Sequence, residues 1–309
     1  MRGSAEADFG RPLRRDRKGG TKVIIWAIAK TTVGDALRRK VLQVFLVVAI
    51  GLIVLSLSFS QTLSFSSQRG ISADLMLLKS FGLGMMALAG IFISLILGVS
   101  LIPQEFERRT IYTILAKPVK RYEFIAGKFL GALLTLAITT GLMGITFIAT
   151  IVAKTIGAHN IVDVKSVSAL QAKADSQIAF FDVNMIWGVA LVYLQFMVLS
   201  SIVLLFSLIF TTTVNFFMGA AVYVVGFMST VVTSLGGAEG ANSFQRAFFK
   251  TIYYVLPRFD QFNIPNQLLH PEAQVTNMAS YTGLMALYGL LYTLLALVAA
   301  ILIFERKEV

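Results

Sequence analysis

Side chains that could carry out catalysis or bind a metal are scarce in this chain of 309 residues. The sequence has no Cys and two His, His159 and His270, which excludes a thiol nucleophile, a disulfide framework and a zinc site built on thiolates. It also lacks the phosphate-binding pattern Gly-x-x-x-x-Gly-Lys-Ser/Thr, because Gly127-Lys128 is followed by Phe129. We therefore expect no catalytic, cofactor-binding or metal-binding residue, and any uphill process must draw its free energy from another polypeptide.

The densest group of ionisable side chains lies between residues 103 and 128, where charge could serve recognition. A short helix is expected over 104–115, and Lys117-Pro118 ends it because proline lacks an N–H and disfavours helix before it. A second helix is expected to start near Arg121. The carboxylates are not needed for membrane topology, so the mixed signs favour docking to a soluble partner over a merely solvated loop. These 26 positions hold nine charged residues: Glu105, Glu107, Arg108, Arg109, Lys117, Lys120, Arg121, Glu123 and Lys128.

The elements that must hold this segment are apolar. The chain is 56% hydrophobic and 14% charged, against about 45–50% and 25% in soluble domains. Six blocks contain no Asp, Glu, Lys, Arg or His, and each is long enough for a helix to cross a hydrocarbon core of about 30 Å. The fourth and fifth blocks are separated at Thr211–Asn215, a polar, β-branched stretch near the centre of their common uncharged run that is the only plausible turn. The predicted fold is an all-α polytopic membrane protein with six transmembrane helices within 41–304: 41–60, 80–102, 129–153, 185–210, 216–235 and 282–304.

The excess of basic residues predicts which side the loops face. Of the 27 Lys and Arg residues, 19 lie in the N-terminal region, the 103–128 segment and the C-terminal tail. By the positive-inside rule, both termini should face the cytoplasm, with 1–21 as a flexible basic tail and 305–309 as a short second one. The excess of positive charge is thus explained by the orientation of the chain in the membrane, and nucleic acid is not an expected partner. Spans without ionisable residues also argue against an ion-coupled carrier and a membrane-embedded enzyme.

Residues 22–40 are expected to form an amphipathic interfacial helix along the cytoplasmic leaflet. Trp26 lies on its apolar face, Asp35, Arg38 and Arg39 lie on the opposite one, and the basic end adjoins the first span. The alternative is a plain cytoplasmic extension of that span. A further helix is expected over 242–256, dipping into the outer interface.

Small residues recur at a spacing of four on the second and third predicted spans. This spacing lets helices approach closely where lipid supplies no hydrophobic drive. The seam could serve packing within the chain or a dimer contact, and both possibilities stay open at this stage. Its members are Gly90, Ser94, Gly98, Gly127 and Gly131.

The charged segment and the six-span layout together resemble the ABC-2 type (type-2 exporter) permease subunits of ABC transporters. The layout covers nearly the whole chain, whereas the motif covers about 26 residues; Arg109 departs from the pattern because many members carry a Gly before the Thr. The motif residues that match in order and spacing are Glu105, Glu107, Thr110, Leu115, Pro118, Val119, Lys120, Arg121, Gly127 and Lys128.

The resemblance implies that this segment is a cytoplasmic coupling helix, which fits a groove on a separate nucleotide-binding subunit. It implies two such ABC ATPase subunits, which bind the ATP and Mg²⁺, and a second permease copy or paralogue. It further implies export across the plasma (inner) membrane of a prokaryote. The expected coupling residues are Glu105, Glu107, Arg108, Arg109, Pro118, Lys120 and Arg121.

Two other function classes remain open from the sequence. One is an ATPase-independent carrier or channel, and the other is a non-transporting membrane scaffold that docks a cytoplasmic partner. The uncharged spans are compatible with lipids, hydrophobic drugs, peptides or a lipid-linked glycan as substrate.

Overall fold

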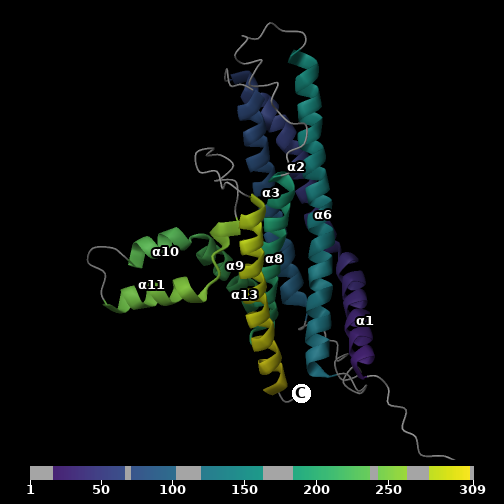
Figure 1. Cartoon of the computed structure of the whole chain (residues 1–309), viewed down its shortest axis with the longest axis vertical. Helices are drawn as coiled ribbons and strands as arrows, with labels where there is room; N and C mark the ends of the chain where they lie inside the picture. Colours follow the sequence, from purple (N-terminus) through teal and green to yellow (C-terminus); the bar gives the residue numbers. More distant parts are fainter. Residues whose placement is uncertain are drawn as a thin grey trace, which may run out of the picture.

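The computed structural model describes residues 17–66, 71–101, 120–162, 184–236, 243–262 and 278–306. Within these ranges all regular elements are helices (Figure 1). They are α1 (Arg17–Leu37), α2 (Lys40–Ser66), α3 (Ile71–Ser100), α6 (Arg121–Val162), α8 (Asn184–Ser207), α9 (Thr212–Phe227), α10 (Ser229–Gly236), α11 (Ser243–Val255), the 3-10 turn η1 (Phe259–Phe262) and α13 (Met278–Arg306).

Five of these helices are long and apolar enough to cross a membrane: α2, α3, α6, α8 and α13. They contain the first, second, third, fourth and sixth predicted blocks, apart from a few terminal residues. This agrees with an all-α polytopic membrane protein. α13 turns leucines outward along its length, as a helix facing hydrocarbon does; among the most exposed are Leu284, Leu287, Leu294 and Leu295.

The fifth block does not form the single helix that was expected over 216–235. α9 is 16 residues long, which corresponds to about 24 Å, and the chain then turns at Met228 into α10. The backbone oxygen of Pro257 lies against Gly226, and the Ser229 hydroxyl donates to the Asp260 carboxylate at 2.7 Å. The 257–262 segment thus packs against the end of α9 and the start of α10.

The polar stretch at Thr211–Asn215 was also assigned wrongly to a turn. α8 ends at Ser207, the turn occupies 208–211, and α9 already begins at Thr212. Asn215 is fully buried, and its side-chain amide donates to the Val203 carbonyl at 3.1 Å. This hydrogen bond ties α9 to α8, because it gives the buried Asn215 amide a partner in otherwise apolar surroundings.

α1 is a helix separate from α2, and the break lies at Arg38–Arg39. The Gln43 side chain donates to the Leu37 carbonyl at 3.0 Å, which satisfies one of the free carbonyls at the end of α1. α1 lies against the first part of α6 (Figure 1). Its predicted position along the cytoplasmic leaflet stays a prediction.

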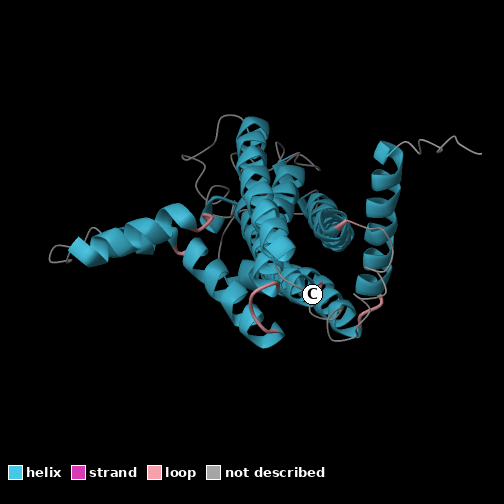
Figure 2. Cartoon of the chain, turned by 90° about the horizontal axis from the view of Figure 1, so that it is seen from below, coloured by secondary structure: helices cyan, strands magenta, loops and turns pink. Residues whose placement is uncertain are grey.

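The helix expected over 242–256 is confirmed as α11. α10 and α11 pack against each other and project from the bundle to the left in both views (Figures 1 and 2). The η1 turn that follows contacts α8 and α9, with Phe259 and Phe262 fully buried. The η1 turn therefore enters the bundle, whereas α10 and α11 lie outside it.

Candidate coupling surface and basic cavity

The start of α6 is built by a local capping arrangement. The Glu123 carboxylate accepts a hydrogen bond from the Lys120 backbone N–H at 3.1 Å, and the Lys120 carbonyl accepts one from the Glu123 N–H at 3.0 Å. A carboxylate three residues into a helix that reaches back to the residue before it is half of a capping box. The helix therefore begins where the sequence predicts, near Arg121, and Glu123 holds its first turn.

Arg121 joins this first turn to the end of α13. Its guanidinium donates to the backbone carbonyls of Phe304 and Glu305, both at 3.2 Å, and lies 5.9 Å from the ring centroid of Phe304. A cation at the last carbonyls of a helix also opposes the negative end of the helix dipole. Lys120, by contrast, is exposed, with its ammonium 5.6 Å from the Tyr122 ring centroid.

The other expected coupling residues, Glu105, Glu107, Arg108, Arg109 and Pro118, lie outside the described residues. Of the coupling set, the structure therefore places only Lys120 and Arg121. Arg121 contacts its own chain, whereas Lys120 is open to a partner.

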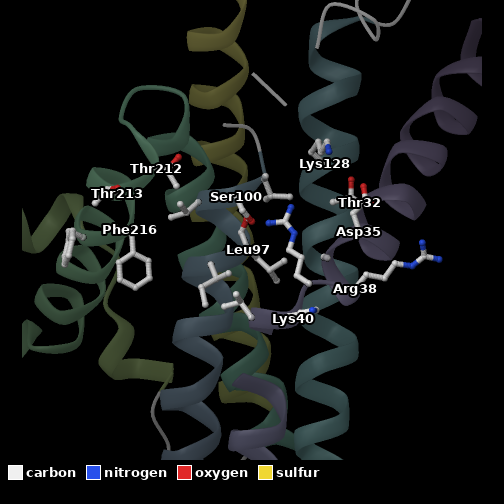
Figure 3. Close-up of a pocket in the computed structure, with 17 residues that line it drawn as sticks. Thr32, Asp35, Arg38, Lys40, Leu97, Ser100, Lys128, Thr212, Thr213 and Phe216 are labelled. Carbon is white, nitrogen blue, oxygen red and sulfur yellow. The ribbon is translucent and has the colours of Figure 1, made fainter. Parts of the chain in front are cut away.

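A cavity of about 760 Å³ lies between α1, the start of α2, the end of α3, α6 and the start of α9. We refer to it as the basic cavity, because four basic residues and one carboxylate line it: Arg38, Arg39, Lys40 and Lys128 with Asp35. Figure 3 shows Lys128, Thr32 and Asp35 on one side and Thr212, Thr213 and Phe216 on the other, with Ser100 and Leu97 between. The Arg38 guanidinium turns away from the centre in this view.

The expected residues of 22–40 divide between this cavity and the surface. Asp35, Arg38 and Arg39 line the basic cavity. Trp26 is 58% exposed and does not line it. The buried face of α1 is instead formed by Ala29, Thr32 and Ala36.

No group of three or more potential metal ligands occurs among the described residues. The basic cavity gathers charged side chains beside helices that are long and apolar enough to cross a membrane. A family model described as ABC-2 family transporter protein matches residues 26–309. The chain belongs to the ABC-2 transporter family. No curated protein sequence matches it.

The match confirms the resemblance seen in the sequence, and the protein is a multi-pass membrane permease of the ABC-transporter type.

The small residues of this permease pack helices of the same chain against each other. A Cβ on Gly127 would lie 2.8 Å from the Ile28 side chain, and one on Gly131 would lie 2.5 Å from Thr32. Because they have no side chain, both glycines allow α1 to pack closely against α6.

The second span of the permease uses its small residues in the same way. Gly90 lies against the Phe196 ring and Gly98 against Val203, both on α8. The Ser94 hydroxyl donates to the Phe196 carbonyl at 3.1 Å. Of the two uses left open by the sequence, packing inside the chain is the one the geometry favours.

Sequence reasoning assigned no site to Thr212 and Thr213. It placed Lys40 only at the basic end of the 22–40 helix, and Lys128 only in the charged segment and the family motif. Lys40, Thr212 and Thr213 lie at the start of a helix, whereas Lys128 lies within α6. The available signal was that Lys40 and Lys128 each directly precede a charge-free block.

Sequence reasoning also missed Arg258 and Asp260, which hold the chain before α13 against neighbouring helices. Arg258 donates to the Tyr253 hydroxyl at 2.7 Å, and its backbone N–H donates to the Tyr288 hydroxyl at 3.0 Å.

Proposed function

We propose that this permease exports a substrate across the plasma membrane of a prokaryote, using ATP hydrolysed by separate ABC ATPase subunits. The observation that carries the proposal is the family match over 26–309, which includes the charged segment 103–128 between two apolar spans. In this proposal both termini and the charged segment face the cytoplasm, and ATP and Mg²⁺ are bound by the partner chains.

The energy source follows from the composition of the spans. Carriers coupled to ions keep ionisable residues within the bilayer, where these bind the ion or relay protons. The six charge-free blocks have none, and the sequence has no phosphate-binding loop. An external motor is therefore the simplest source of free energy.

The contact with the motor is assigned to Glu105, Glu107, Arg108 and Lys120, with Pro118 setting the turn between the two halves of the segment. Arg121 has a different role, which is to connect α6 to α13. Because its guanidinium binds the end of α13, a push on the segment before α6 is passed to both the third and the last spans. ATP-driven closure of two ATPase subunits would then rock these spans towards an outward-open state.

The proposal also assigns a role to the η1 turn, which the proposed topology places towards the outer side. Phe259 and Phe262 are fully buried, with Phe259 5.2 Å from the Tyr223 ring and Phe262 6.1 Å from the Tyr288 ring, measured between centroids. In our proposal this short turn closes the outer end of the substrate's path between α8, α9 and α13.

A second permease copy or a paralogue completes the proposed transporter.

The direct test of the proposal is purification of the tagged permease in detergent, followed by mass spectrometry of the proteins bound to it. We expect an ABC ATPase at equal abundance with the permease. Reversing both carboxylates, Glu105→Lys with Glu107→Lys, should remove that ATPase because each contact becomes a like-charge one.

A matched control is Asp163→Lys with Asp175→Lys, which makes the same charge change in the loop predicted to lie on the outer side. This control should keep the ATPase bound. Retention of the ATPase by the Glu105/Glu107 variant, or its equal loss from the control, would contradict the assigned contact.

The two alternative functions predict different outcomes. Transport in proteoliposomes that persists without ATP would favour a carrier or channel. A stable ATPase complex without any ATP-dependent flux of lipids, drugs, peptides or glycan-linked lipids would favour a scaffold.

A further inference from the structure

The basic cavity combines a cationic wall with an apolar one. Arg39, Lys40 and Lys128 belong to the cationic part, and Asp35 is the single carboxylate in the lining. A concave surface lined mainly by one sign of charge concentrates the electrostatic field and raises the local concentration of counter-ions. The cavity therefore selects for an anion.

One of these cations is set into the wall. Lys128 is only 8% exposed, and its ammonium lies 5.8 Å from the ring centroid of Phe124. A long side chain held along an aromatic ring in this way has fewer conformations to lose when an anion binds. The opposite rim adds Thr212 and Thr213 from the first turn of α9, whose Thr211 side chain makes no capping hydrogen bond. The amides of such a turn also favour negative charge.

The apolar part of the lining is formed by Leu97 and Val99 of α3 and by Phe216 and Phe217 of α9. A free inorganic anion would gain nothing from these side chains. An amphiphile would contact them with its hydrocarbon chain while its anionic group meets the cations. The volume of about 760 Å³ lies within the range of sites for such molecules, roughly 300–1,000 Å³.

In the proposed topology, the cavity lies near the cytoplasmic ends of the spans, where such groups occur. Lys40 begins α2, Leu101 follows the last residue of α3, Lys128 precedes the third charge-free block and Thr212 begins α9. The lining thus comes from the N-terminal parts of α2, α6 and α9 and the C-terminal end of α3, which the proposed topology places near the boundary of headgroups and hydrocarbon. Basic pockets between membrane helices on the cytoplasmic side bind anionic lipid headgroups.

We propose that the basic cavity binds the phosphate headgroup of an anionic phospholipid, with an acyl chain lying along Leu97 and Phe216. The assignment to the cytoplasmic leaflet rests on the proposed topology. The binding itself requires no ATPase, so it can be tested separately from the proposed transport function.

The test is titration of the purified full-length permease with phosphatidylglycerol, phosphatidylcholine or inorganic phosphate, followed by native mass spectrometry. We expect phosphatidylglycerol to bind at least tenfold more tightly than phosphatidylcholine. Arg39→Gln with Lys40→Gln should weaken phosphatidylglycerol binding by roughly 30-fold, the expected effect of removing two basic contacts.

The matched control is Lys22→Gln with Lys30→Gln, which removes two exposed basic residues of α1 that do not line the cavity. It should leave phosphatidylglycerol binding within about threefold of the unaltered protein. A second variant, Thr213→Trp, fills the rim from an exposed position without changing charge, and it should also abolish the preference for phosphatidylglycerol.

Three outcomes would overturn the proposal. They are equal binding of the two lipids, an equal loss in the Lys22/Lys30 control, and an unchanged lipid preference in Thr213→Trp. Binding of inorganic phosphate that depends on Arg39 and Lys40, without binding of phosphatidylglycerol, would instead assign the cavity to a soluble anion and overturn the lipid as its occupant.

Discussion

The guanidinium of Arg121, at the first residue of α6, donates a hydrogen bond of 3.2 Å to the backbone carbonyl of Phe304, near the end of α13. The two residues are far apart in sequence, and this contact joins the end of the charged segment to the end of the last span. If the proposed ATPase contact displaces the start of α6, this bond would pass the displacement to the end of α13 as well.

Loss of this contact should weaken the bundle. Arg121→Gln removes the bonds to Phe304 and Glu305 and the cation at the end of α13, so we expect the free energy of unfolding to fall by about 1 kcal/mol. Thermal unfolding in detergent measures it. Lys120→Gln, at an exposed neighbour, should shift stability by less than about 0.5 kcal/mol. Equal effects of the two variants would contradict the bridging part given to Arg121.

The contact between α1 and α6 should depend on Gly131. Gly131→Ala places a methyl group 2.5 Å from the Thr32 side chain, so we expect a loss of about 1–3 kcal/mol and faster proteolysis of α1. Gly141 has nothing within 4 Å of its Cβ position, and Gly141→Ala should be neutral or stabilising because alanine favours helix. If proteolysis of α1 is unchanged in Gly131→Ala, the α1–α6 contact is not the one described.

The turn that enters the bundle should be held by its aromatic residues. Phe259 is fully buried whereas Phe244 on α11 is 80% exposed. Phe259→Ala should therefore cost about 3–5 kcal/mol of stability, and Phe244→Ala less than about 0.5 kcal/mol. Chemical or thermal unfolding of the two variants in the same detergent makes the comparison. A small effect at Phe259 would mean that the turn does not stay inserted.

The predicted topology can be mapped simply because the chain has no Cys. In intact cells, a membrane-impermeant maleimide should label Ser176→Cys in the outer loop. It should label Thr113→Cys, in the charged segment, only after the cells are permeabilised. The opposite pattern would place the charged segment and the basic cavity on the outer side and remove the basis for ATPase coupling.

The long helices were predictable because each contains an uninterrupted charge-free block. The division of the fifth block was not, because an uncharged run fits one long helix or two short ones equally well. The turn after α8 was placed a few residues late. The hydrogen bond from Asn215 to Val203, which holds the start of α9 against α8, is a tertiary contact that the sequence does not reveal.

The candidate site was predictable only in part. The spacing of Gly127 and Gly131 shows that a helix can approach closely, but the helix that does so, α1, is set by the fold. The basic cavity draws on residues from several helix ends, and no local pattern connects Lys40 with Thr212. Arg121 matched a family motif, yet its position against the end of α13 follows only from the packing of α6 beside the last span.

The most direct measurement of the central claim is photocrosslinking from the charged segment. Phe106 is replaced by p-benzoylphenylalanine, and Phe180 in the predicted outer loop is replaced in the same way as a control. After irradiation in cells, we predict an adduct between the Phe106 variant and an ABC ATPase, and none from the Phe180 variant. An irradiated Phe106 variant that yields no ATPase adduct, or one that crosslinks no more than the Phe180 variant, would contradict the account.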